Sequence, residues 1–223
     1  MNSLVIVPIR TCLALPNRHR MPVGGEPMSV PILKALLATK DYSNVVVTSE
    51  VEDARHLALD LGAKSCDIPL GLSGEVALSS IVAYTLTKLG FTGDAVFVVN
   101  EAAPFVTADD VSTVGKHLQD GKFQSVVTVT ETRPTVMKAL RKGKRGFWHE
   151  DEAKRAVFVS NEMVRAVSLP YFFETHRVIG AKGGIVLVPP ERAVVVKDAW
   201  DYMKAKGMYD ELRNIGSRKA EVR

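Results

Sequence analysis

The sequence contains no apolar run close to the roughly 20 residues that a helix needs to cross a lipid bilayer, so no membrane partner is expected. Its 223 residues include only two cysteines, Cys12 and Cys66, whose separation fits neither a metal site nor a disulfide framework. The first apolar run, residues 4–9, follows no basic stretch and predicts a strand, not a signal peptide. These absences favour a cytoplasmic protein.

A strong charge of one sign is also missing. The net charge of +4 is mild, and it suits an enzyme that handles phosphates as well as it suits a nucleic-acid binder. The one dense basic run, residues 138–145 (KALRKGKR), lacks the aromatic side chains that a base-stacking surface needs. We therefore interpret it as a solvated hairpin tip and expect no nucleic-acid partner. No Gly-x-Gly-x-x-Gly follows the first strand, which argues against a dinucleotide-binding oxidoreductase.

The first half of the chain alternates predicted strands and helices. Strands are expected at residues 4–9, 44–48, 64–68, 95–99 and 125–130, and helices at 28–39, 50–61, about 78–89 and from Thr107 onward. This order predicts an α/β fold with a Rossmann-like, doubly wound and mostly parallel sheet. Ligands of such sheets lie outside the carboxyl ends of the strands, here the loops that begin at Arg10, Ser49, Ile68 and Asn100.

The second half of the chain has a different pattern. Residues 131–180 hold short apolar pieces separated by charges and turns, which predicts an antiparallel arm inserted into a single domain, 1–223. Strands at 183–188 and 194–196 and a helix at 198–206 are expected to complete that domain. The isolated apolar pieces of the arm need a covering surface, which favours a homodimer formed through it.

The loop after the first strand, residues 10–27, supplies Arg10, Arg18 and Arg20. Guanidinium groups make paired contacts with phosphate oxygens, and the exposed amides of such a loop can add further donors. The composition fits an ordinary surface loop with solvated arginines equally well.

An ordered set of short motifs covers nearly the whole chain. Arg10 is followed by Leu-Pro-Asn-Arg at 15–18 and Gly-Gly-Glu-Pro at 24–27, and the next strand ends in Thr-Ser-Glu at 48–50. Later come Leu-Gly-Ala at 61–63, Pro-Phe at 104–105, Asp-Asp-Val at 109–111, Ser-Val-Val-Thr-Val-Thr-Glu at 125–131, Lys-Gly-Gly-Ile at 182–185 and Asp-Tyr at 201–202. This set resembles the signature of the CMP-acylneuraminate and CMP-ketodeoxyoctonate synthetases, a cytidylyltransferase family.

The resemblance implies a CTP-dependent cytidylyltransferase that binds Mg²⁺, forms a CMP-linked acidic sugar (a nonulosonic or octulosonic acid) and releases pyrophosphate. It also implies a homodimer that exchanges the arm. Arg10 and Arg18 would be the catalytic residues that hold the phosphates of CTP. The resemblance further assigns to the nucleotide Asn17, Gly24, Ser49, Glu50 and Asn100, and to the acceptor sugar Ser73 and Lys138.

The sequence departs from the family pattern at three places. The phosphate loop at 11–15 (TCLAL) is one residue short and lacks the usual glycine and serine, and Ala102 stands about where ketodeoxyoctonate synthetases have an aspartate. The family's late Asp-x-Asp, which helps to hold magnesium, aligns with residues 195–197. Glu101 and Asp198 are left as candidate magnesium ligands, and Asp198 also fits the N-cap of a helix.

These departures keep two alternatives open. One is a catalytically weak or silent homologue that binds a nucleotide or a protein partner. The other is a nucleotidyltransferase of the same fold with a different acceptor.

Overall fold

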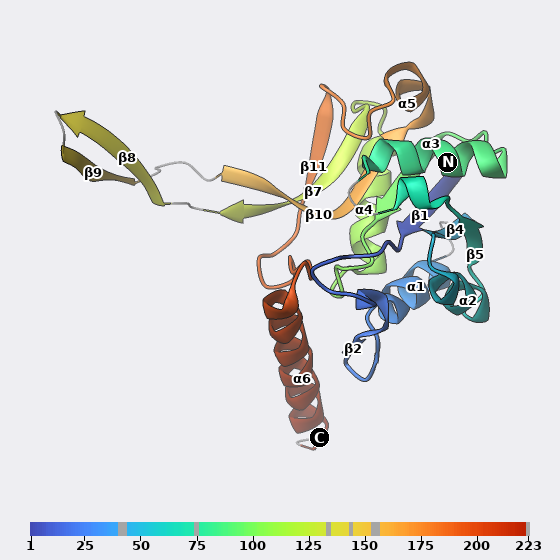
Figure 1. Ribbon diagram of the computed structural model, residues 1–223, viewed down its shortest axis with the longest axis horizontal. Helices are drawn as coiled ribbons and strands as arrows, with labels where there is room; N and C mark the ends of the chain where they lie inside the picture. Colours follow the sequence, from blue (N-terminus) through green and yellow to red (C-terminus); the bar gives the residue numbers. More distant parts are fainter. Residues whose placement is uncertain (40–43, 74–75, 133–134, 143–144, 153–156, 222–223) are drawn as a thin grey trace.

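A seven-stranded sheet forms the centre of the chain in the computed structural model (Figure 1). The structure describes residues 1–39, 44–73, 76–132, 135–142, 145–152 and 157–221, with the side chains in these ranges apart from those at 135–152 and 213–221. The strand order is β11-β7-β10-β6-β1-β4-β5. Along the chain these strands are β1 Ser3–Pro8, β4 Asn44–Ser49, β5 Lys64–Asp67, β6 Ala95–Val99, β7 Ser125–Thr132, β10 Val157–Ser168 and β11 Gly183–Leu187.

Six of the seven strands run in one direction. β1 pairs in parallel with β4 and β6, β4 with β5, and β7 with β11, whereas β10 is antiparallel to both β6 and β7. The runs rich in valine and isoleucine predicted these strands because β-branched side chains pack well on a pleated surface buried on both faces. The predicted Rossmann-like, mostly parallel sheet is confirmed.

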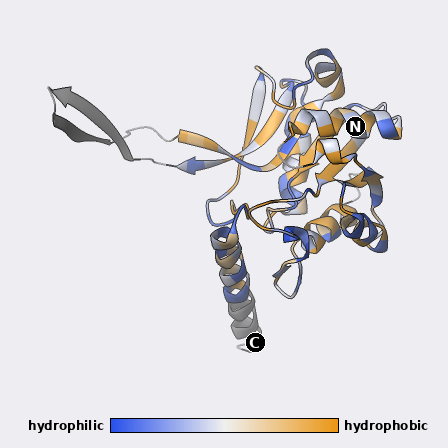
Figure 2. Cartoon of the chain, viewed as in Figure 1, coloured by the Kyte–Doolittle hydropathy of each residue, from blue (hydrophilic) through white to orange (hydrophobic). Residues whose placement is uncertain are grey.

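Helices cover both faces of the sheet. On one face α1 Ser29–Ala38, α2 Glu52–Asp60 and α4 Ala108–Gln119 bury a core that includes Leu33, Ala58 and Val114. On the other face α3 Leu78–Leu89 and α5 Leu169–Thr175 bury a second core that includes Leu86 and Phe172. Figure 2 shows the hydrophobic residues gathered where these helices meet the sheet. A doubly wound sheet follows from this division of the core.

The N-terminus of α4 begins where the sequence predicts a cap. The Thr107 hydroxyl accepts a hydrogen bond from the Asp110 amide, and the Asp110 carboxylate accepts one from the Thr107 amide. Arg192 donates two further hydrogen bonds to the same carboxylate, at 2.6 and 2.9 Å. Burial raises the pKa of Asp110, but the hydrogen bonds from Arg192 and Thr107 outweigh burial and hold the pKa below its usual value. This ion pair ties the segment that follows β11 to the start of α4.

The segment predicted as an inserted arm, residues 131–180, is divided between the central sheet and a separate hairpin. β8 Thr135–Lys142 and β9 Arg145–Glu152 form that antiparallel hairpin, which lies well away from the sheet in Figure 1. β10, by contrast, enters the sheet between β6 and β7, and α5, which follows it, packs on one face of the sheet. The predicted boundary is therefore too wide at its C-terminal end, because a single antiparallel strand in a parallel sheet has no distinct sequence pattern.

The C-terminal segment also differs from the prediction. Within the described part of the chain, residues 194–196 pair with no strand, and the Val196 amide instead donates to the Ala102 carbonyl at 2.8 Å. The last helix, α6 Ala199–Glu221, is much longer than the predicted 198–206. Its first turns pack with Leu15, Val23 and Phe105 in a third apolar cluster beside the loop after β1. No helix in the described ranges combines the length and the apolar character that a membrane crossing requires.

Gly24 lies where this loop meets α6, in the turn between β2 Pro22–Val23 and β3 Glu26–Pro27. Its φ is +69°, and a Cβ at this position would lie 2.2 Å from the Tyr209 ring. Gly25 has a φ of +90° but open space around its Cα. Gly24 is therefore constrained by both backbone and packing, and Gly25 by backbone alone.

Gly24→Ala should lower the free energy of unfolding by about 1–3 kcal/mol more than Gly25→Ala, because only the former overpacks the contact with α6. Urea denaturation of the two variants measures the difference. Equal losses would show that Tyr209 does not press on this turn.

Candidate active site: a cationic cavity at the sheet edge

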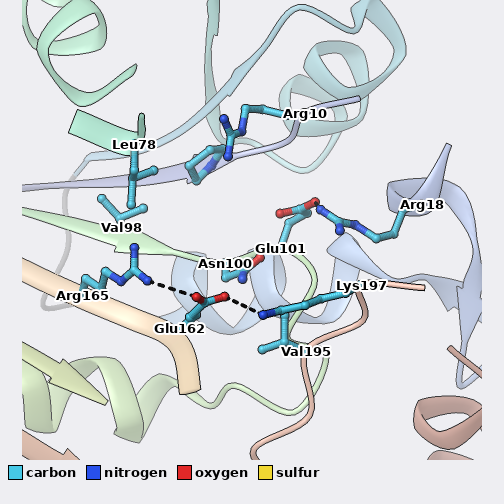
Figure 3. A pocket seen from close by; sticks show the side chains of 11 residues that line it. Arg10, Arg18, Leu78, Val98, Asn100, Glu101, Glu162, Arg165, Val195 and Lys197 are labelled. Carbon is cyan, nitrogen blue, oxygen red and sulfur yellow. Dashed lines mark hydrogen bonds and ion pairs between the residues drawn. The ribbon is translucent and has the colours of Figure 1, made fainter. Parts of the chain in front are cut away.

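A cavity of about 310 Å³ opens where β1 and β6 end and β10 passes beside them (Figure 3). This is the edge at which the strand order predicts a ligand. The start of α3 and the segment before α6 complete the wall. The lining residues are Pro8, Arg10, Arg18, Leu78, Val98, Asn100, Glu101, Glu162, Arg165, Val195 and Lys197. Since four of these are cations and two are carboxylates, positive charge is in excess.

Arg10 enters the cavity directly after β1. Its Nη1 donates to the Val76 carbonyl at 2.8 Å, which orients the guanidinium across the cavity toward the start of α3. The backbone beside it is held by Glu50, whose Oε1 accepts a hydrogen bond from the Thr11 amide at 2.7 Å. Glu50 Oε2 is buried without a hydrogen-bond partner among the described residues. Glu50 therefore acts on this loop and does not line the cavity, although the resemblance places it near the nucleotide.

Arg18 lies in a short 3-10 helix, Arg18–Arg20, and closes the opposite side of the cavity. Its Nη2 and Glu101 Oε1 are 2.5 Å apart, and its Nη1 donates to the Val196 carbonyl at 3.0 Å. Both side chains are largely buried, with exposed fractions of 15% and 4%. Arg18 thus joins three segments: the loop after β1, the turn after β6 and the chain before α6.

Glu101 is the most buried carboxylate of the cavity. Burial raises its pKa above the usual value for glutamate, and the positive charge and hydrogen bond of Arg18 oppose that rise. Its sequence neighbour Asn100 shapes the same turn, because Asn100 Oδ1 accepts a hydrogen bond from the Ala102 amide at 3.0 Å. Asn100 also lines the cavity.

Three charged residues of the cavity are not identified by the sequence analysis as ligands: Glu162, Arg165 and Lys197. Glu162 and Arg165 lie at an irregularity in β10, where the register with β7 shifts between Ser160 and Arg165. Glu162 Oε2 is 3.0 Å from Lys197 Nζ, and its Oε1 is 3.7 Å from Arg165 Nη2. No local sequence signal marks such a bulge, so these residues become visible only in the fold.

Several residues assigned to the nucleotide lie outside the cavity lining. Ser49 is buried, and its hydroxyl accepts a hydrogen bond from the Val51 amide at 2.9 Å at the start of α2. Asn17 is exposed and adopts a left-handed backbone (φ 56°) just before the 3-10 helix. Gly24 packs on Tyr209 of α6. Asn17 and Gly24 therefore shape the loop, and Ser49 stabilises the turn before α2. None of the three lines the cavity, although the resemblance assigns them to the nucleotide.

Neither of the two residues assigned to the acceptor sugar, Ser73 and Lys138, is among the described residues that line the cavity. The Ser73 hydroxyl donates to the Leu70 carbonyl at 2.6 Å, within a local turn. Lys138 lies on β8 of the hairpin, and its side chain falls outside the described residues.

The cavity does not offer a fitting set of magnesium ligands. Magnesium is usually held by one or two carboxylates together with substrate phosphates. Here Glu101 forms an ion pair with Arg18, and Glu162 forms ion pairs with Lys197 and Arg165. Asp198 does not line the cavity; its Oδ1 accepts hydrogen bonds from the Trp200 and Asp201 amides at 2.9 Å each, as an N-cap of α6. Among the described residues, no group of three or more His, Cys, Asp or Glu side chains could hold a metal ion.

The strand order defines a doubly wound α/β fold, and comparison with solved structures shows that cytidylyltransferases share this fold. One such structure is CMP:2-keto-3-deoxy-manno-octonic acid synthetase complexed with CTP, with a TM-score of 0.69 and 11% identity over 95% of this chain and 99% of that chain.

A second similar structure is 4-diphosphocytidyl-2C-methyl-D-erythritol synthase from Anaerococcus prevotii DSM 20548. Its TM-score is 0.66 at 12% identity, over 92% of this chain and 97% of that chain. No protein-family model and no curated protein sequence matches the chain. The resemblance drawn from the sequence motifs is thus confirmed at the level of the fold.

Arg18→Ala should destabilise the protein in a pH-dependent way, because it leaves the Glu101 carboxylate buried without its cation. Removing one partner of a buried pair costs about 3–5 kcal/mol, which is the loss we expect in the free energy of unfolding at pH 7. A carboxyl whose pKa is raised in the folded state destabilises that state as the pH rises above its unfolded value of about 4.3. The loss should therefore shrink as the pH is lowered toward that value.

Urea denaturation at both pH values tests this expectation, and the double variant Arg18→Ala/Glu101→Gln is the control. The second substitution removes the uncompensated charge and should restore most of the stability at pH 7. An equal loss at both pH values, with no recovery in the double variant, would show that Arg18 stabilises the fold only through its packing and its bond to Val196.

Proposed function

We propose that the chain is a cytidylyltransferase that takes CTP and an acidic sugar, forms the CMP-linked sugar and releases pyrophosphate. The observation that carries the proposal is the cavity rich in arginine and lysine at the carboxyl ends of β1 and β6. It occupies the ligand-binding edge of a fold shared with a synthetase complexed with CTP.

The reaction needs positioning and charge neutralisation more than covalent chemistry from the protein. A sugar hydroxyl attacks the α-phosphorus of CTP, the bond from that phosphorus to the bridging oxygen breaks, and the hydroxyl proton is released to water. Negative charge grows on the leaving pyrophosphate. Guanidinium groups fixed by the fold stabilise that charge without reorganising, which is the contribution we assign to Arg10 and Arg18. Arg18 can stabilise this charge while it stays paired with Glu101, or after a phosphate oxygen replaces the Glu101 carboxylate as its partner.

The excess of cations supports an acceptor that is itself an anion. Arg165 Nε is buried and has no hydrogen-bond partner among the described residues, so a ligand oxygen can satisfy it. A carboxylate beside the attacking hydroxyl, as in a nonulosonic or octulosonic acid, supplies such an oxygen. A sugar phosphate supplies one too, which keeps a transferase with a different acceptor as the second candidate.

The sheet face that contains Arg165 supports the proposed homodimer. Arg165 pairs with Val127 of β7, which pairs in turn with Ile185 of β11, so the three side chains share one face. Beyond the cavity this face exposes large apolar side chains: Ile185 is 45% exposed, Leu187 56% and Phe158 49%. The α4 helix covers the opposite face of the same strands. We assign this face and the β8–β9 hairpin to a contact with a second copy of the chain.

Arg10→Ala should weaken CTP binding by about 1.5–3 kcal/mol, the scale of hydrogen bonds to a charged group. Arg20→Ala is the matched control, because Arg20 lies in the same loop but pairs with Asp53 and does not line the cavity. Calorimetry gives both affinities, and pyrophosphate release across a panel of acidic sugars and sugar phosphates identifies the acceptor. Equal affinities in both variants would remove Arg10 from the phosphate site.

The unmodified protein should have the mass of a dimer in light scattering at micromolar concentration. The double variant Ile185→Asp/Leu187→Asp places two carboxylates on the proposed contact face and should shift it to a monomer while circular dichroism stays unchanged. A monomeric unmodified protein, or a variant that stays dimeric, would contradict the assignment of this face.

A further inference from the structure

The carboxylates of the cavity are already occupied by side-chain cations. Each is an ion-pair partner: Glu101 of Arg18, and Glu162 of both Lys197 and Arg165. A carboxylate that neutralises a guanidinium or an ammonium is a poor ligand for a divalent ion, because it would have to leave its cation unpaired. The charge that balances bound phosphates must therefore come largely from the side chains.

Lys197 is placed at the cavity by a segment that is fixed at several points. The Val196 amide donates to Ala102, and the Val196 carbonyl accepts from Arg18. The Lys197 amide donates to Asp201 Oδ2 at 3.2 Å, in the first turn of α6. The backbone that carries Lys197 is thus held to the turn after β6, to the loop after β1 and to the last helix.

Glu162 is held opposite Lys197 by an unfavourable backbone. Its φ of +59° lies in the left-handed region, which is strained for a residue with a Cβ. The surrounding hydrogen bonds maintain it: Asn161 Oδ1 accepts from Thr128 Oγ1 at 2.6 Å, and Asn161 Nδ2 donates to Thr130 Oγ1 at 3.1 Å. Such strain persists at sites where the structure over-determines the position of a side chain. Here it places a carboxylate between two cations, Arg165 and Lys197.

The ion pair between Glu162 and Lys197 is able to exchange partners. Lys197 is 63% exposed and Glu162 43%, and pairs with this accessibility contribute little net free energy. A phosphate, which carries more charge and more acceptor oxygens than a carboxylate, can take Lys197 from Glu162. Glu162 is then the counter-ion of the ligand-free cavity.

We propose that Lys197 binds phosphate groups of the nucleotide directly and that tight nucleotide binding requires no divalent metal ion. The inference rests on the proposed function for the identity of the nucleotide. It identifies one residue that binds substrate, Lys197, and one, Glu162, that neutralises Lys197 in the ligand-free cavity. An ammonium cannot bridge several phosphate oxygens as a metal ion does, so the arginines of the cavity share this task.

The affinity for CTP is measured by calorimetry in EDTA and in excess Mg²⁺, with inorganic triphosphate as a second probe. We expect affinities within about threefold of each other in the two buffers, a difference below about 0.7 kcal/mol. Lys197→Met should weaken binding in EDTA by about tenfold or more, the loss of one hydrogen bond to a charged group. Lys88→Met is the control, because Lys88 pairs with Asp67 and lies outside the cavity lining.

Glu162→Gln should bind CTP in EDTA more tightly than the unmodified protein, because it removes the charge that competes for Lys197. If Glu162 and Lys197 had a purely structural role, both Glu162→Gln and Lys197→Met would lower the affinity. A tighter Glu162→Gln variant therefore indicates that Lys197 binds the ligand. CTP binding only in Mg²⁺, or an unchanged affinity in Lys197→Met, would overturn the inference. A third outcome is that triphosphate binds in EDTA in a way that depends on Lys197, whereas CTP does not bind. This result would support the cationic site and contradict the proposed use of CTP. Failure of both probes to bind in EDTA would overturn the inference.

Discussion

The ion pair between Arg18 and Glu101 is the contact on which the cavity depends. It joins the loop after β1 to the turn after β6, and the second hydrogen bond of Arg18, to Val196, adds the segment before α6. Each of these segments is far from the others in sequence, and each carries a side chain that lines the cavity. A buried pair of this kind contributes little to stability by itself, since desolvation offsets its attraction, but breaking it is costly. Its value here is geometric, because it fixes where the other cations lie.

The remaining charges follow from that framework. With residues 195–197 held in place, Lys197 meets Glu162 across the cavity, and the bulge in β10 places Glu162 beside Arg165. The positive charge is therefore distributed over four side chains from three parts of the chain: the loop after β1, β10 and the segment before α6. The ligand that we propose for this site is an extended anion, the phosphate chain of a nucleotide.

Much of the fold could be predicted from the sequence, because continuous valine-rich runs and helical stripes mark β1, β4, β6 and the helices between them. Arg10, Arg18 and Asn100 could be placed at the ligand edge for the same reason: each closely follows a predicted strand of a parallel sheet. The N-cap of α4 formed by Thr107 depends only on neighbouring residues, so it could be predicted from the sequence as well. Elements that depend on long-range pairing could not be predicted from the sequence. β10 inserts antiparallel between β6 and β7, and α6 continues past Gly207, a residue that disfavours helices.

The roles of Ser49 and Asp198 show the same limit at the level of single residues. Serine and aspartate side chains bind ligands, stabilise turns and cap helices. Only the hydrogen bonds seen in the structure show that Ser49 stabilises the turn before α2 and that Asp198 caps α6. A crystal structure of the protein soaked with CTP tests the central claim, that this cavity holds the phosphates of the nucleotide. We expect triphosphate density between Arg10 and Lys197, with Glu162 released from Lys197. Nucleotide density elsewhere on the molecule, with all the ion pairs of the cavity intact, would contradict it.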